Sequence, residues 1–261
     1  DVRGFTTISE MFDAQGLTKL INRLLTPLTG IILKRLGTVD KYIGDCIMAF
    51  WNAPLDDPDH GRNACRAALE MNRAMIAFDK QIEAEAKQEN RRHAPLKIGT
   101  GINSGDIVVG NMGSDQRFDY SVLGDNVNLA SRLEGQCKTY GVDIVVGQNT
   151  AVKAPDFAML EADLIKVKGK TEAVRIYVLL GDETVAATPD FESLKRQHDG
   201  MLAAYRTQKW DVARLKLQSG RAKMNGHNIG ALYNLYEERI AAFEKNPPPP
   251  DWDGVFVATS K

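Results

Sequence analysis

The clearest structural signal in the chain is the stretch Lys41-Tyr42-Ile43-Gly44-Asp45-Cys46-Ile47-Met48-Ala49-Phe50-Trp51. Two short apolar runs, Thr38–Ile43 and Cys46–Trp51, flank its Gly44-Asp45 pair, and this arrangement predicts a tight β-hairpin. Lys41 and Asp45 place a cation and an anion on either side of the expected turn. Because charges beside a turn are usually solvated surface groups, this stretch alone predicts a hairpin without a function.

The size and charge of the chain narrow the possible classes of protein. Its 261 residues can bury one large hydrophobic core or two smaller ones. With 33 basic and 34 acidic residues and a formal net charge of −1, no overall field favours nucleic acid or a membrane surface as a partner. The three cysteines, Cys46, Cys65 and Cys137, are widely spaced and odd in number, which predicts neither a disulfide framework nor a zinc site.

The sequence contains no visible targeting or membrane-spanning segment. No apolar run approaches the ~20 residues of a membrane helix, and the N-terminus lacks the pattern of a signal peptide. We therefore expect no membrane contact within these residues. The chain starts with Asp rather than Met, in the middle of a motif, and we expect it to be a fragment of a longer protein.

Hydrophobic periodicity predicts three long helices. Leucines and isoleucines recur at helical spacing over 16–36, and a second apolar face runs through 60–89. A third helix is expected from Asp125 or Asn126 to Tyr140. The stretch Thr7-Ile8-Ser9-Glu10 has the spacing of a capping box, which predicts a further helix with Thr7 as its cap.

Short β-rich runs lie between and after these helices. The runs 96–102 and 107–109 flank Asn103-Ser104-Gly105-Asp106 and predict a second hairpin. The runs 164–170 and 175–180 predict a last strand pair. Strands that are joined by hairpins and alternate with helices predict an α+β fold rather than a doubly wound sheet.

The character of the sequence changes near Thr184. Residues 1–183 form the predicted α+β domain, and 184–190 read as a linker. We expect residues 191–261 to form a small helical extension that weakly resembles a tetratricopeptide-type helix pair and ends in a Pro-rich tail. Trp252 and Phe256 predict that this tail packs back onto the body of the protein.

Two further stretches accompany the Lys41–Trp51 hairpin. They are Asp1-Val2-Arg3-Gly4-Phe5-Thr6-Thr7 and Asp119-Tyr120-Ser121-Val122-Leu123-Gly124-Asp125-Asn126-Val127-Asn128-Leu129-Ala130-Ser131-Arg132. Together the three stretches resemble the catalytic domain of the class III nucleotidyl cyclases, most of all the bacterial adenylate cyclases of that class. The likeness extends from Asp1 to about Leu180. It implies a ferredoxin-like core, in which helices flank a sheet rich in antiparallel strands.

The resemblance implies an enzyme that converts ATP into 3′,5′-cyclic AMP and pyrophosphate, by attack of the ribose 3′-hydroxyl on the α-phosphate. It also implies two Mg²⁺ or Mn²⁺ ions per active site, held by Asp1, Asp45 and the Val2 carbonyl. Oxygen ligands suit such hard cations, although as isolated acids Asp1 and Asp45 would be ordinary turn residues. We expect Phe5 and Thr6, where a strand end leads into a helix, to offer backbone N–H groups to phosphate.

The same family pattern places the adenine base against Lys41, which would donate to N1, and Ser121, which would meet the exocyclic amine. Ser121 departs from the Thr or Asp that related adenylate cyclases usually carry. By resemblance, Asn128 orients the ribose and Arg132 stabilises charge on the α-phosphoryl oxygens. Lys168 would bind the terminal phosphates, although alone it would be a solvated hairpin lysine.

The resemblance also implies a homodimer. In the family, the metal-binding acids face the base-binding residues and the arginine across a two-fold interface, so Lys41 and Asp45 of one chain would serve different sites. Sensor and membrane helices often lie upstream, which implies the cytoplasmic catalytic domain of a membrane-anchored bacterial protein. Two alternatives stay open: a guanylate cyclase, against which Lys41 argues, and a catalytically silent nucleotide-binding regulatory homologue.

Overall fold

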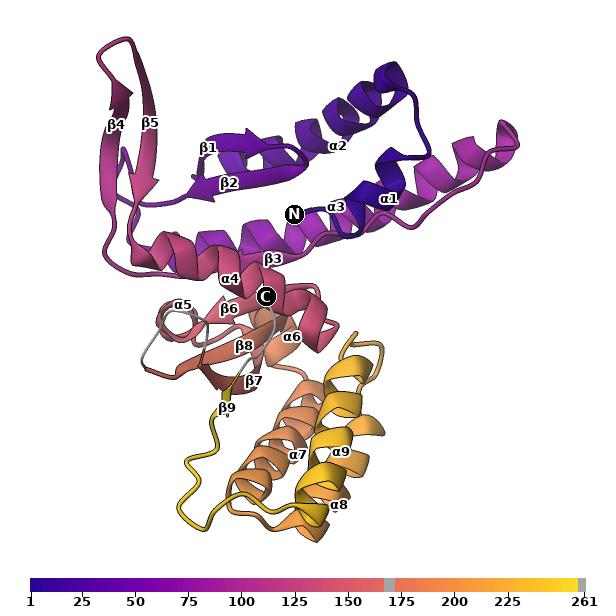
Figure 1. Ribbon diagram of the computed structural model, residues 1–261, viewed down its shortest axis with the longest axis vertical. Helices are drawn as coiled ribbons and strands as arrows, with labels where there is room; N and C mark the ends of the chain where they lie inside the picture. Colours follow the sequence, from indigo (N-terminus) through magenta and orange to yellow (C-terminus); the bar gives the residue numbers. More distant parts are fainter. Residues whose placement is uncertain (167–171, 258–261) are drawn as a thin grey trace. The chain divides into compact units, whose positions relative to one another are not determined.

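A computed structural model describes residues 1–166 and 172–257, which divide into two units. The first unit comprises Asp1–Thr100 and Ser104–Leu129, and the second comprises Gly101–Asn103 and the described residues from Ala130 onward. Figure 1 shows helices and strands mixed along the chain, which confirms the predicted α+β class. In the described ranges, no helix combines the length and the apolar character needed to cross a membrane.

The elements of the first unit are α1 (Phe5–Ser9), α2 (Ala14–Lys34), β1 (Thr38–Ile43), β2 (Cys46–Phe50), α3 (His60–Gln88), β4 (Val108–Ser114) and β5 (Arg117–Leu123). Helix α4 (Asp125–Tyr140) begins in the first unit and ends in the second. The other elements are β3 (Thr100–Ile102), β6 (Ile144–Gly147), α5 (Gln148–Lys153), β7 (Ala158–Lys166), β8 (Val174–Gly181), α6 (Glu183–Ala186), α7 (Pro189–Arg206), α8 (Trp210–Arg221), α9 (Gly230–Lys245) and β9 (Phe256–Val257).

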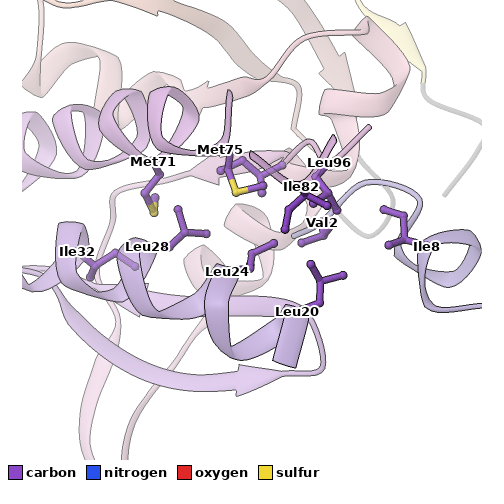
Figure 2. Packing of buried hydrophobic residues seen from close by; sticks show 11 residues of the cluster. Val2, Ile8, Leu20, Leu24, Leu28, Ile32, Met71, Met75, Ile82 and Leu96 are labelled. Atoms are coloured by element: carbon purple, nitrogen blue, oxygen red, sulfur yellow. The ribbon is translucent and has the colours of Figure 1, made fainter. Parts of the chain in front are cut away.

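The hydrophobic core of the first unit lies between α2 and α3. Every fourth residue along one face of α2 is buried in this core: Leu20, Leu24, Leu28 and Ile32. Figure 2 shows Met71 and Met75 of α3 opposite this face. Val2 and Leu96 belong to the same buried cluster. The core therefore anchors the N-terminal segment as well as the two helices.

The structure confirms the first predicted hairpin. Strand β1 pairs antiparallel with β2, and Ile43 faces Cys46 across the turn. Gly44, the first turn residue, has a φ of 64°, which glycine adopts without strain. The indole Nε1 of Trp51 donates to the Arg35 carbonyl at 2.8 Å, and this bond ties the hairpin to the end of α2.

The second predicted hairpin is wrong. Strand β3 lies beside β6 in the sheet of the second unit, whereas β4 pairs with β5 from Val108↔Leu123 to Ser114↔Arg117. From Gly110 onward β4 consists largely of polar residues and glycine. Because such a strand lacks apolar alternation, its pairing with β5 left little signal in the sequence.

The expected capping box is also wrong. Helix α1 begins at Phe5 with Gly4 as its N-cap, so Thr7 lies inside the helix and Glu10 is the C-cap. Gly4 has a φ of 67°, and this left-handed residue turns the chain into the helix three residues before the predicted cap.

Five strands of the second unit form one sheet, in the order β3-β6-β8-β7-β9. Strand β8 pairs antiparallel with both β6 and β7, and β9 pairs parallel with β7. Strands β7 and β8 confirm the last predicted strand pair. Of residues 167–173, which separate these strands in the sequence, 167–171 lie outside the described residues.

Helices α7, α8 and α9 confirm the helical character expected near the C-terminus. Within the predicted linker 184–190, α6 ends at Ala186 and α7 starts at Pro189. The tail packs as expected: the ring centroid of Trp252 lies 5.3 Å from that of Tyr205 and 5.2 Å from that of Phe243. The functional domain division and the tetratricopeptide likeness stay predictions.

A buried ion pair connects several elements of the second unit. Asp163 Oδ2, on β7, accepts hydrogen bonds from the Tyr140 hydroxyl at 2.7 Å and from Arg239 Nη1, on α9, at 2.6 Å. The side chains of Arg239 and Asp163 are 7% and 1% exposed. The Arg239 guanidinium also lies 3.6 Å from the ring centroid of Phe256 in β9. One charge pair therefore joins the sheet to α4, α9 and the tail.

Replacing Arg239 with Ala should lower the free energy of unfolding by about 3–5 kcal/mol, because the Asp163 carboxylate stays buried without its cation. Urea denaturation followed by circular dichroism measures the loss. Arg214→Ala is the matched control, since Arg214 reaches the same helix through a half-exposed pair with Glu244. The control should cost less than about 1 kcal/mol. Equal losses in the two variants would contradict the importance of burial.

Candidate active site

The N-terminal segment is held in a short antiparallel ladder. Gly99 N donates to the Asp1 carbonyl at 2.9 Å, and Arg3 N donates to the Lys97 carbonyl at 2.8 Å. Val2 lies between these bonds, opposite Ile98, and its side chain is buried in the core. The ladder and the core together fix the position of Asp1 and Val2.

The hairpin turn carries Asp45 to this segment. The N–H of Val2 donates to Asp45 Oδ2 at 3.2 Å. In an antiparallel ladder, a residue between two hydrogen-bonded positions directs its own N–H and C=O away from the partner strand. The backbone groups of Val2 therefore face the side on which Asp45 lies. The structure thus brings together the Asp1-Val2 segment and Asp45, which the sequence predicted to bind metal.

The chemistry of this donor set fits a divalent metal. Two carboxylates and a backbone carbonyl offer only oxygen atoms, as hard cations such as Mg²⁺ and Mn²⁺ require. Among the described residues, no group of three or more His, Cys, Asp or Glu could hold a metal by itself. Mg²⁺ is commonly held by one or two carboxylates together with substrate phosphates. The residues present therefore suit a metal that is shared with a phosphate-bearing ligand.

Helix α1 starts directly after this donor set. The N–H groups of Thr7 and Ile8 bond to the Gly4 carbonyl, at 3.0 and 3.2 Å. Phe5 and Thr6 are the first two helical residues, and N–H groups at such positions have no acceptor within a helix. These N–H groups are the donors that the sequence predicted for phosphate.

A second group of contacts surrounds the predicted base-binding residues. Ser121 Oγ donates to Asp40 Oδ2 at 2.8 Å, and Lys41 Nζ lies 3.4 Å from Asp40 Oδ1. Asp40 therefore links Lys41 to Ser121, which lies 80 positions further along the chain. The sequence motifs do not single out Asp40. An acid inside the apolar run Thr38–Ile43 was the available signal, because such a residue needs a partner if its side chain is buried.

Helix α4 carries the remaining predicted residues. Asn128 and Arg132 are four residues apart and so share one face of this helix. Asn128 is exposed, whereas Arg132 is half-buried. Arg132 Nη1 is buried and has no hydrogen-bond partner in the described part of the chain. A buried guanidinium N–H without a partner is costly, which makes it a suitable donor for an anionic ligand. Lys168 lies outside the described residues.

The chain is similar to known nucleotide cyclases. The family described as the adenylate and guanylate cyclase catalytic domain matches residues 1–181. Adenylate cyclase 1 of Rhizobium meliloti is 32% identical over 182 residues, which cover 69% of this chain and 26% of the relative. The chain therefore spans about a quarter of the length of that curated relative.

Two solved structures resemble the fold. The adenylyl cyclase CyaB from P. aeruginosa matches with a TM-score of 0.61 and 34% identity, over 70% of this chain and 91% of that one. The guanylyl cyclase Cya2 matches with a TM-score of 0.62 and 30% identity, over 70% of this chain and 89% of that one. The motifs, the fold and these matches agree, and the chain belongs to the family of adenylate and guanylate cyclase catalytic domains.

Proposed function

We propose that this domain is an adenylate cyclase, which converts ATP into 3′,5′-cyclic AMP and pyrophosphate. The observation that carries the proposal is the contact between Asp45 and Val2, because it gathers oxygen donors beside the start of α1. Two divalent cations, when bound, would activate the ribose 3′-hydroxyl and offset phosphate charge. Asp1, Asp45 and the Val2 carbonyl are the residues that would hold them.

The other residues would position the substrate and stabilise charge. The Phe5 and Thr6 N–H groups would bind phosphate oxygens, and Lys168 the terminal phosphates. Asn128 would orient the ribose. Arg132 would stabilise the charge that develops on the α-phosphoryl oxygens, and its unpartnered Nη1 supports this role.

Adenine is favoured over guanine by Lys41, because an ammonium can only donate and adenine N1 can only accept. Relatives of both kinds exist: an adenylyl cyclase at 34% identity and a guanylyl cyclase at 30%. A guanylate cyclase is therefore the second candidate. Measuring kcat/KM with ATP and with GTP, each with Mg²⁺ or Mn²⁺, tests the proposal. Faster turnover of GTP would overturn the assignment to adenylate cyclase, and no turnover would indicate a silent homologue.

We also propose that the domain is active as a C2 homodimer. The metal-binding acids of one chain would face Lys41, Ser121, Asn128 and Arg132 of its partner, so that each dimer contains two equivalent sites. A monomer would then have no complete site.

Asp45→Asn should reduce Mg²⁺-dependent turnover by at least about 100-fold, because the amide keeps a hydrogen-bond acceptor for Val2 but loses the negative charge. Binding of Mn²⁺ in the presence of a non-cyclisable ATP analogue, followed by calorimetry, should weaken in parallel. Asp56→Asn is the control, since this acid is exposed in the loop after β2. Near-normal turnover and metal binding by Asp45→Asn would refute the metal assignment.

Mixing Asp45→Ala chains with Arg132→Ala chains should restore activity that neither variant has alone. If chains exchange freely, half of the dimers are mixed and each keeps one of its two sites, so about a quarter of the wild-type activity should return. Cyclic AMP production after co-refolding measures the recovery. Mixed dimers that are confirmed by mass yet inactive would indicate that each site is built within one chain.

A further inference from the structure

Asp40 occupies an irregular position in strand β1. Val39 pairs with Ala49 and Lys41 pairs with the next residue on β2, Met48, so Asp40 is the extra residue of a β-bulge. In a regular strand, neighbouring side chains point to opposite faces of the sheet. A bulge redirects side chains locally. It allows the Asp40 carboxylate to lie 3.4 Å from the ammonium of its own neighbour, Lys41.

The carboxylate of Asp40 is buried. A buried charge is costly unless it has polar or charged partners. The side chain of Asp40 is 0% exposed, whereas that of Lys41 is 42% exposed. Oδ2 accepts the hydrogen bond from Ser121 Oγ, and Ser121 is itself buried. Oδ1 is buried and accepts no hydrogen bond from any described residue, and the ion-pair partner it faces is Lys41. Both partners of this costly buried charge are thus the two residues that would contact the base.

The hydrogen bond that Ser121 Oγ donates to Asp40 limits the hydrogen bonds that this hydroxyl can make to a ligand. A free serine hydroxyl can donate one hydrogen bond and accept two, so it can meet either an amine or a carbonyl. An ionised carboxylate can only accept, so a hydroxyl bound to Asp40 has already used its proton. The oxygen of Ser121 can then offer only lone pairs to a ligand.

We propose that Asp40 is a positioning residue that sets the selectivity of the site for adenine over guanine. The proposal rests on the proposed function, in which Lys41 meets the N1 edge and Ser121 the exocyclic group of the base. Adenine presents an acceptor at N1, which matches the Lys41 ammonium, and an amine donor at position 6, which matches the lone pairs of Ser121. Guanine presents an N1–H donor to the ammonium and a carbonyl acceptor to the serine lone pairs, and both pairs repel. Asp40 thereby makes the Ser121 hydroxyl, which could otherwise donate or accept, act toward the base only as a hydrogen-bond acceptor.

Asp40→Asn tests this role. The amide can donate to Ser121 Oγ, which frees the hydroxyl proton for a carbonyl, and it no longer attracts the Lys41 ammonium. The ratio of affinities for ATP and GTP analogues, measured by calorimetry, should fall about tenfold, as expected when one polar group gains or loses a partner. The ratio of kcat/KM values should fall alike. A ratio does not change if the variant merely lowers the fraction of folded protein.

Asp57→Asn is the matched control. Asp57 is another buried acid of the first unit and is 6% exposed. It accepts hydrogen bonds from Asn63 Nδ2 at 2.9 Å and from Asp59 N at 3.0 Å, and neither of these partners is a proposed base-binding residue. Its replacement should affect binding of the two nucleotides equally.

Two outcomes would overturn the proposal. One is a wild-type affinity ratio near one, and the other is a ratio that Asp40→Asn leaves unchanged. Turnover by the wild-type protein is scored separately, because absent turnover refutes the proposed function and leaves the affinity ratio measurable. In a Ser121→Ala background, Asp40→Asn should change the ratio much less, since one of its two partners is already gone.

Discussion

The hydrogen bond from the Val2 N–H to the Asp45 carboxylate depends on two separate parts of the first unit. The ladder with Lys97–Gly99 directs the Val2 N–H away from its partner strand. The turn of the β1–β2 hairpin places the Asp45 carboxylate where it accepts a hydrogen bond from that N–H. Burial of Val2 in the α2–α3 core holds the ladder in place. The oxygen donors of the candidate site are thus positioned by packing of the core, and loop geometry contributes only the turn at Gly44.

The two groups of contacts in the site use acids in different ways. Asp45 sits in a turn, half-buried, where a carboxylate can reach a cation that a phosphate also binds. Asp40 lies within a strand and is enclosed, so its charge acts on the residues beside it rather than on a ligand. Asp45, which is suited to a metal, lies five positions after Asp40, which is suited to orienting polar groups. Burial, rather than residue type, distinguishes the two.

Much of the fold could be predicted from the sequence, because its strongest signals are local. The β1–β2 hairpin has a Gly-Asp turn between apolar runs, and α2 and α3 have regular apolar faces. The β4–β5 hairpin was missed because β4 is polar and rich in glycine, and the start of α1 because a backbone conformation at Gly4 determines it. The residues that we propose to bind the metal and the base stand out through their motifs. Asp40 does not, since its bulge and its bond to Ser121 arise only when distant strands meet.

The Asp163–Arg239 pair has a consequence for where this domain can be cut. The family match ends at residue 181, yet Asp163 in β7 accepts a hydrogen bond from Arg239, which lies after residue 181. The Tyr236 hydroxyl donates to the Ala162 carbonyl at 2.7 Å, and β9 covers the outer edge of β7 at Ile165 and Lys166. A chain that stopped at residue 181 would expose an open strand edge beside an uncompensated carboxylate, and open edges promote aggregation. We therefore expect the part of this chain that folds together to extend beyond the part that matches the family.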